Sequence, residues 1–141
     1  RRQRQMCIRD RNSILEQFVA HLTLAEDEIA LLDMEAGVEH FGRGTDNSVD
    51  GILMIVDPSF ESLRLSAKIA DLSTSIGKPI WFCLNKLTEE TVQMMEEEVG
   101  KHGAIIGRMP LNHDLALAGL TGTELQMTIA PISEMAQFLT Q

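Results

Sequence analysis

A short segment that begins with Asp33 combines residue types that can hold magnesium and phosphate. Asp33 ends the apolar run 29–32, and Gly37 follows four residues later in a loop that contains further glycines. A carboxylate at the end of a buried strand can orient Mg²⁺ through water, and a loop glycine can offer its backbone N–H to a terminal phosphate. The same spacing also fits a helix-capping aspartate and a turn glycine, so it does not discriminate between the two interpretations.

Alternating strands and helices are the elements that must position these residues. Short continuous apolar runs predict strands buried on both faces, and apolar residues at helical spacing predict helices between them. The expected strands are residues 29–32, 52–56, 80–84 and 104–107. The expected helices are residues 12–24, 60–76, 88–99, 115–120 and 129–140. This order predicts an α/β fold of three layers, in which helices cover both faces of a parallel sheet.

Polar residues follow the expected strands. Asp33, Asp57 and Asn85 each come directly after an apolar run, and a loop with Pro110 follows the fourth run. Ligands of open parallel sheets bind at the carboxyl ends of the strands. We therefore expect the functional site at this edge of the sheet.

The composition indicates one globular domain that needs no disulfide. The 141 residues include 12 basic and 21 acidic side chains, and the net charge of −9 disfavours general binding to nucleic acid or to an anionic membrane. The two cysteines, Cys7 and Cys83, form neither a CxxC nor a Cys/His spacing, and no apolar run is long enough to cross a bilayer. We therefore predict a cytoplasmic protein without membrane or nucleic-acid partners.

The first eleven residues differ from the rest of the chain. They read RRQRQMCIRDR, which is rich in arginine and has no apolar periodicity. A basic arm for nucleic acid or membrane, or the start of a targeting peptide, is one interpretation. We favour another, in which residues 1–11 are a non-native tail that resembles translated adapter or vector sequence.

The full sequence around Asp33 points to a family more specifically than the spacing of Asp33 and Gly37 alone. It reads DMEAGVEHFGRGT, then VDGILMIVDPSFESLRLSAKIADL and later FCLNK. These strings resemble the CooC-type ATPases, which are nickel-insertion factors for carbon monoxide dehydrogenase in the MinD/ParA-type deviant-Walker P-loop group. The resemblance covers residues 12–141. It implies the C-terminal part of a MinD/CooC-like nucleotide-binding domain, with a P-loop NTPase fold of the SIMIBI class truncated at its N-terminus.

The resemblance also implies roles for residues of the first loop. Asp33 would orient Mg²⁺ and its waters, and Gly37 would lie at the γ-phosphate and sense hydrolysis. Glu39, His40 and Arg43 would form a switch that couples the nucleotide state to dimerisation.

Residues further along the chain would bind the base of the nucleotide. By the same resemblance, Asn85 would form a hydrogen bond with the base, and Lys86 follows it directly. Pro110, Leu111 and Asn112 would flank the base, and Asn112 stands where the family usually has Asp.

The implied function is that of a metallochaperone that binds and hydrolyses ATP with Mg²⁺. It would dimerise with nucleotide and assist nickel insertion into a client metalloenzyme, carbon monoxide dehydrogenase. Two family motifs are absent from these residues: the Gly-x-x-x-x-Gly-Lys-[Ser/Thr] phosphate loop, and the Cys-x-Cys nickel motif, which Cys7 does not replace. We therefore expect the full-length protein to be an ATPase and this fragment alone to be inactive, because the phosphate loop neutralises most of the phosphate charge.

Two alternatives stay open. A MinD/ParA-type positioning ATPase is disfavoured because residues 129–141 contain no Lys or Arg for a membrane-binding helix. A catalytically inactive α/β interaction module is the other alternative. Asp33, Asp57 and Lys86 could imitate the acidic residues and lysine of a receiver-like site, although the glycine-rich loop argues against it.

Overall fold

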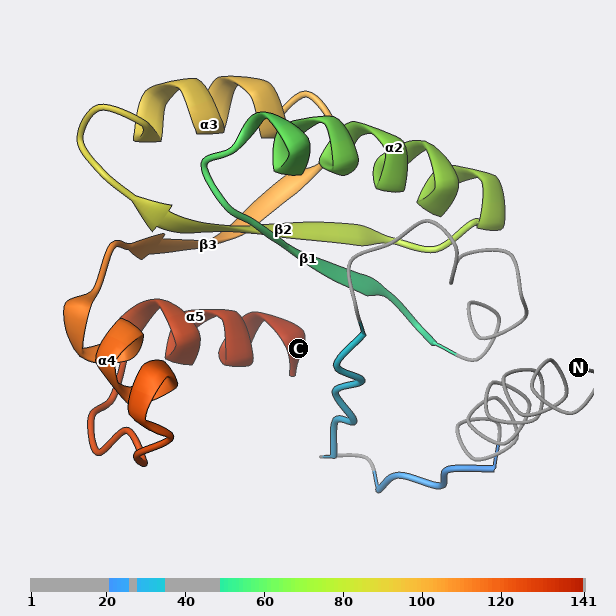
Figure 1. Cartoon of the computed structure of the whole chain (residues 1–141). Helices are drawn as coiled ribbons and strands as arrows, with labels where there is room; N and C mark the ends of the chain where they lie inside the picture. Colours follow the sequence, from blue (N-terminus) through green and yellow to red (C-terminus); the bar gives the residue numbers. More distant parts are fainter. Residues whose placement is uncertain (1–20, 26–27, 35–48, 141) are drawn as a thin grey trace, which may run out of the picture.

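The chain forms alternating strands and helices, followed by two further helices (Figure 1). The computed structural model describes residues 21–25, 28–34 and 49–140. The elements in these ranges are β1 (Ile52–Val56), α2 (Phe60–Ile76), β2 (Ile80–Leu87), α3 (Val92–Val99), β3 (Ala104–Pro110), α4 (His113–Thr121) and α5 (Ala130–Leu139). Each strand and helix overlaps one expected from the sequence.

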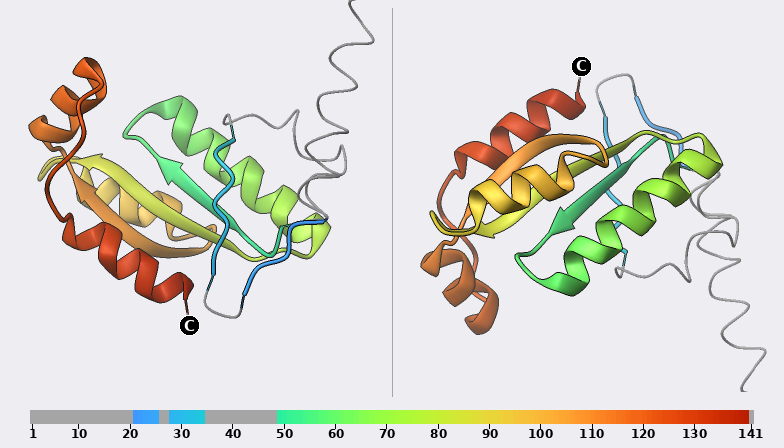
Figure 2. Two further views of the ribbon diagram at one scale, coloured as in Figure 1. Left: turned by 90° about the horizontal axis from the view of Figure 1, so that it is seen from below. Right: turned by 90° about the horizontal axis from the view of Figure 1, so that it is seen from above.

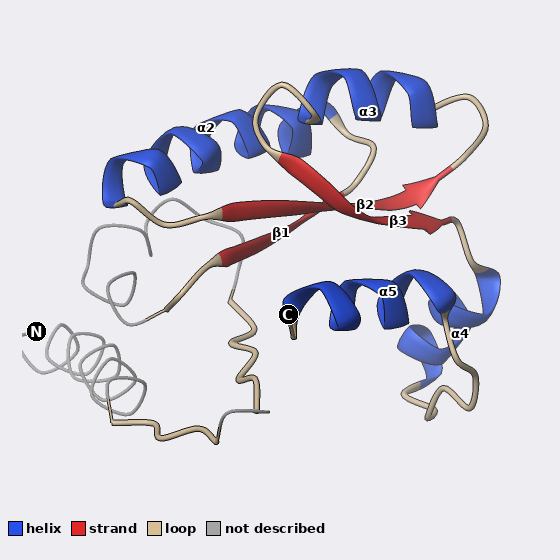
Figure 3. Cartoon of the chain, turned by 180° about the vertical axis from the view of Figure 1, so that it is seen from behind, coloured by secondary structure: helices blue, strands red, loops and turns tan. Residues whose placement is uncertain are grey.

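The three strands form one parallel sheet in the order β1-β2-β3. Ile52 pairs with Ile80, and Trp81 pairs with Ala104. Helices α2 and α3 cover one face, and α5 lies against the other (Figures 1 and 2). The view from behind shows the same three layers (Figure 3). This arrangement confirms the expected α/β class and is consistent with the sheet of a P-loop NTPase.

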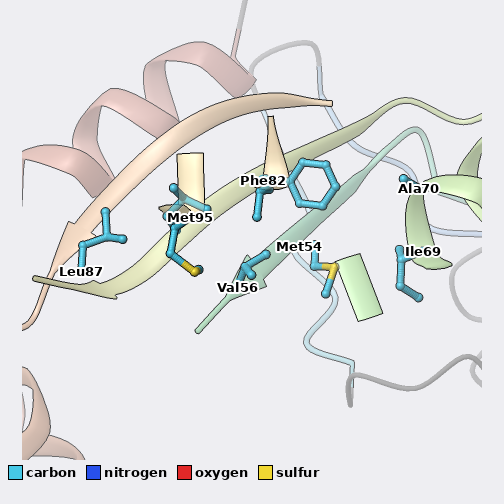
Figure 4. Packing of buried hydrophobic residues seen from close by; sticks show 9 residues of the cluster. Met54, Val56, Ile69, Ala70, Phe82, Leu87 and Met95 are labelled. Atoms are coloured by element: carbon cyan, nitrogen blue, oxygen red, sulfur yellow. The ribbon is translucent and has the colours of Figure 1, made fainter. Parts of the chain in front are cut away.

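The larger core lies between the sheet and the helices α2 and α3 (Figure 4). Val56, Phe82 and Leu84 from the strands are fully buried there against Met95 and Val99 of α3. A smaller cluster on the other face joins Cys83 to Met109 and to Met135 of α5. Since successive strand residues point to opposite faces, Cys83 lies on one side and its neighbours 82 and 84 on the other. Burial on both faces explains why β2 reads as a continuous apolar run.

Local signals place both ends of α2 as the sequence predicts. The Ser59 hydroxyl accepts a hydrogen bond from the Ser62 backbone N–H, which satisfies one donor of the first turn. Gly77 ends the helix with φ of 67°, and its backbone N–H donates to carbonyls of the last turn. This left-handed conformation favours glycine, which has no β-carbon to clash.

The strand expected at residues 29–32 is not formed, and this prediction is wrong. Residues 28–34 contain no regular secondary structure, and Leu31 is 79% exposed. The segment lies on the α5 side of the sheet, below β1 in the view of Figure 1, and pairs with no strand. An apolar run favours burial, but only a ladder of backbone hydrogen bonds makes it a buried strand.

The predicted helix 12–24 falls mostly outside the described residues. Its last residues, 21–24, are described and are not helical. In the described parts of the chain, we find no helix with the length and apolar character that a membrane span requires.

Candidate functional site

The carboxylate of Asp57 joins the ends of two neighbouring strands. Asp57 directly follows β1, and Asn85 and Lys86 lie near the end of β2. The Asn85 side-chain amide donates a hydrogen bond to Asp57 Oδ1 over 2.8 Å. The Lys86 ammonium group donates to Asp57 Oδ2 over 2.5 Å. Both oxygens of one carboxylate therefore bind consecutive residues of the next strand.

An irregularity in β2 makes this double contact possible. Consecutive side chains of a regular strand point to opposite faces, so Asn85 and Lys86 would not both reach one carboxylate. The pairing of β2 with β3 shifts register between Leu84 and Leu87, and Lys86 adopts φ of 54°. Such bulges are frequent next to binding sites because they redirect a side chain. Pairing resumes at Leu87, so β2 extends three residues beyond the expected end at residue 84.

The contacts of Asp57 keep its carboxylate ionised. The hydrogen bond from Lys86 lowers the pKa of Asp57 below its ordinary value of 3.8, and the hydrogen bond from Asn85 lowers it further, against a partial desolvation that raises it. The thiol of Cys83 behaves in the opposite way, since burial raises its pKa and keeps it neutral.

A pocket of about 360 Å³ opens beside this carboxylate, between the ends of the strands and the helices α4 and α5. Asn85, Lys86 and Asn112 give it a polar edge. Its other walls are mostly apolar and come from three strands and both helices. They include Ile55, Cys83, Met109, Pro110, Leu111, Leu115, Ala116, Ile132 and Met135.

The loop between β3 and α4 is fixed at both ends. The Leu111 backbone N–H donates to the Leu87 carbonyl over 2.9 Å, which ties the loop to β2. The Asn112 side-chain oxygen accepts from the backbone N–H groups of Asp114 and Leu115, and so caps α4. Asn and Asp are both good helix caps, so Asn112 serves this structural role as well as the Asp that the resemblance leads one to expect there.

The structure brings together five of the residues that the resemblance implicates. Asn85, Lys86, Pro110, Leu111 and Asn112 all line the one pocket described above. The strand pattern of the sequence already placed Asn85 and a loop with Pro110 at this edge of the sheet, and the resemblance added Lys86, Leu111 and Asn112. Pro110 is not in a loop, however, but is the last residue of β3.

The described residues bring no further candidate to this pocket. Asp33 is exposed, follows no strand, and makes no hydrogen bond or ion pair in the described part of the chain. Its expected position at a strand end is therefore wrong, while its role toward Mg²⁺ stays a prediction. Four further candidates, Gly37, Glu39, His40 and Arg43, lie outside the described residues.

Sequence reasoning did not include Asp57 among the site residues. It identified Asp57 only as a strand ending and as one member of a receiver-like alternative. The signal that could have found its partners is positional, since neighbouring parallel strands bring their carboxyl ends together. Asp57 and Lys86 do meet, as that alternative requires, but the described contacts do not include Asp33.

The pocket has the chemistry of a site for a planar ring with a polar edge. Apolar walls favour the faces of such a ring, and a few fixed polar groups set its orientation. In the ranges that the structure describes, no three His, Cys, Asp or Glu side chains gather as ligands for a metal ion.

The fold and this pocket define a parallel α/β domain whose pocket lies where such sheets bind their ligands. The chain is 36% identical over 135 residues to an uncharacterized ATP-binding protein of Methanocaldococcus jannaschii, and the match covers 96% of this chain and 54% of that protein. A second uncharacterized ATP-binding protein of the same organism is 29% identical over 126 residues, which is 86% of this chain and 48% of that protein.

A relative with a named role covers a smaller part of the chain. The carbon monoxide dehydrogenase accessory protein CooC of Rhodospirillum rubrum is 37% identical over 82 residues, which is 57% of this chain and 31% of that protein. The chain thus spans about half the length, or less, of the curated relatives it matches. No protein-family model matches the sequence. Two of the three relatives are described as ATP-binding proteins.

Proposed function

We propose that this chain supplies the base-binding part of an ATP-binding domain. The pocket at the carboxyl ends of the strands carries this proposal, since it combines apolar walls with the amide of Asn85 and the ammonium group of Lys86. Relatives described as ATP-binding proteins support it independently. The base would lie between the apolar walls, with its polar edge at Asn85.

Binding of the ATP phosphates would require a phosphate-binding loop, and the usual motif for such a loop is absent from these 141 residues. The sequence contains no Gly-x-x-x-x-Gly-Lys-[Ser/Thr] loop, which in P-loop proteins surrounds the phosphates with backbone N–H groups and a lysine. We therefore propose that the complete gene product, rather than these residues alone, binds ATP tightly and hydrolyses it. In that protein Asp33 would orient Mg²⁺ through water.

The more specific proposal is a CooC-type metallochaperone ATPase. The match to CooC supports it, and so does the sequence pattern between residues 33 and 44. In this proposal the protein forms a homodimer with ATP, through Glu39, His40 and Arg43. It then assists nickel insertion into carbon monoxide dehydrogenase. A MinD/ParA-type positioning ATPase is the alternative, and it would bind lipid vesicles in the presence of ATP.

Binding of ATP to the complete gene product tests the base pocket. We expect isothermal titration to detect binding, and we expect Asn85→Ala to weaken it about tenfold, because the base loses a hydrogen-bond partner. Gln93→Ala is the matched control, since it removes an exposed amide from α3 on the opposite face of the sheet. A protein that binds no ATP, or an Asn85→Ala variant that binds like the wild type, would contradict the proposal.

Hydrolysis of ATP tests the role of Asp33. We expect Asp33→Ala to lower the Mg²⁺-dependent rate, because the carboxylate no longer orients the ion and its waters. Asp50→Ala removes another acidic residue exposed to solvent and should leave the rate unchanged. Unchanged hydrolysis by Asp33→Ala would refute the magnesium role without affecting the base pocket.

A further inference from the structure

Asp57 contacts residues of the pocket without lining it. Its two carboxylate oxygens bind Asn85 and Lys86, and both of these residues line the pocket. Any influence of Asp57 on a ligand must therefore act through Asn85 and Lys86.

The contact fixes the orientation of the Asn85 amide. An ionised carboxylate can only accept hydrogen bonds, so Asn85 must turn its NH₂ group toward Asp57 and its oxygen away from it. In the described part of the chain, this amide oxygen accepts no hydrogen bond. Asn85 therefore offers its oxygen as an acceptor in a fixed orientation, beside the second N–H of its NH₂ group.

Lys86 secures this arrangement from the other side. Its ammonium group binds the second oxygen of Asp57, so the carboxylate has a charged partner and stays ionised at neutral pH. A neutral partner such as a hydroxyl or an amide could both donate and accept, and would then permit either orientation of the Asn85 amide. Among these groups, only a carboxylate at position 57 restricts the Asn85 amide to one orientation.

We propose that Asp57 is a positioning residue for base selectivity: by holding the NH₂ group of Asn85, it presents the amide oxygen to the base and favours a base with an amino group at its 6-position over one with a carbonyl there. This inference rests on the proposed function, because it concerns the base in the same pocket. Adenine carries such an amino donor, whereas hypoxanthine and guanine carry an acceptor at that position.

The test compares ATP with inosine triphosphate, which differs at this edge of the base and lacks the 2-amino group of guanine. We expect the wild-type gene product to prefer ATP. In Asp57→Asn the Asn85 amide can turn, so we expect the ratio of the two dissociation constants to fall roughly three- to tenfold. Asp57→Glu keeps a carboxylate and should retain more of the preference than Asp57→Asn.

Asp71→Asn is the matched control, since it makes the same chemical change at an exposed position of α2 and should keep the wild-type ratio. A merely structural role of Asp57 would lower the affinity for both nucleotides equally and would leave the ratio unchanged. If Asp57→Asn does not fold, Asp57→Ser is measured instead, because its hydroxyl also donates and accepts.

The outcomes separate the two proposals. A wild-type protein that binds ATP, with an unchanged ratio in the Asp57 variants, would overturn the positioning role and leave the base pocket intact. A wild-type protein that binds neither nucleotide would overturn the proposed function and this inference with it. A ratio that falls in Asp57→Asn but not in Asp71→Asn would support both.

Discussion

The carboxylate of Asp57 connects residues that lie far apart in the sequence. Its partners, Asn85 and Lys86, follow 28 and 29 positions later, at the end of the neighbouring strand. The Lys86 side chain is 56% exposed and that of Asp57 is 41% exposed, so water screens their attraction. Exposed ion pairs of this kind contribute little stability, which makes positioning the more important effect of the contact.

Lys86 adopts a left-handed backbone conformation that is unusual for a residue with a side chain. Its φ of 54° costs free energy compared with an ordinary strand conformation. The contact with Asp57 and the resumed pairing at Leu87 hold it there. This backbone conformation is what allows neighbouring side chains to share one carboxylate.

The first prediction concerns pH and Asp57. Its folded-state pKa lies below the ordinary value of 3.8, so its contribution to stability is present above that value and is lost as the pH falls through the folded-state pKa. The difference in free energy of unfolding between the wild type and Asp57→Asn should therefore be larger at about pH 7 than at about pH 3. Urea unfolding at both pH values measures it. A difference that grows on acidification would contradict the contact with Lys86.

At the scale of elements, a helix cap and a close helix–sheet contact shape the pocket. Asn112 begins α4, and Gly107 allows α5 to approach the sheet. Both residues follow β2 in the sequence, and most of the residues that line the pocket also come from this part of the chain. Each makes a prediction about stability.

The second prediction concerns the cap of α4. Asn112→Ala removes the acceptor for two backbone N–H groups of the first turn and should destabilise the protein by about 1 kcal/mol. Asn112→Asp keeps an acceptor and should leave the stability unchanged or slightly raised, since a negative charge favours a helix N-terminus. Thermal unfolding of the three proteins measures the effect. Equal stability of Asn112→Ala and the wild type would show that the cap is unimportant.

The third prediction concerns the contact between α5 and the sheet. A β-carbon at Gly107 would lie 2.8 Å from the Cys83 sulfur and would also collide with Met135. Gly107→Ala should therefore destabilise the protein by about 1–3 kcal/mol through overpacking, which urea unfolding measures. Part of this loss should disappear in a Met135→Ala background, because one of the colliding groups is then gone.

Gly119 provides the control for this substitution. It lies in α4, and a β-carbon there would meet nothing within 4 Å. Gly119→Ala should stabilise the protein slightly, because alanine is the better helix former. If both glycine variants had the same stability, close packing at Gly107 would not be the reason for the glycine.

At the scale of the whole molecule, β2 is the central element. It pairs with a strand on each side, and its side chains enter the apolar clusters on both faces of the sheet. The segment 28–34 has the opposite character, since it pairs with no strand and most of its side chains are exposed. Stability should therefore differ strongly between these parts of the chain.

The fourth prediction is the order of hydrogen exchange. Backbone amides of β2 should exchange most slowly among the described residues, because their exposure requires opening of the whole sheet. Amides of residues 28–34 should exchange fastest, because they form no ladder of hydrogen bonds with a neighbouring strand. Exchange measured by mass spectrometry on the chain tests this order. Slow exchange in residues 28–34 would instead indicate a strand that this structure does not contain.

For residues 49–140, the sequence by itself determined the types of element and most of their ends. The apolar run 52–56, the cap Ser59 and the stop at Gly77 are local signals, and local sterics and hydrogen bonding act on them directly. The family resemblance also grouped Asn85, Lys86 and the residues 110–112 before any contact was known. These features depend on a few neighbouring residues, which is why they could be read from the sequence.

The tertiary structure alone decided how distant segments meet. Nothing local to residues 29–32 shows that this apolar run lacks a pairing partner, and nothing local to Asp57 shows that Asn85 and Lys86 will both bind it. The bulge that carries β2 on to Leu87 likewise depends on its pairing with β3. Backbone ladders and hydrogen bonds between strands exist only after the chain has folded, because their partners lie tens of residues apart.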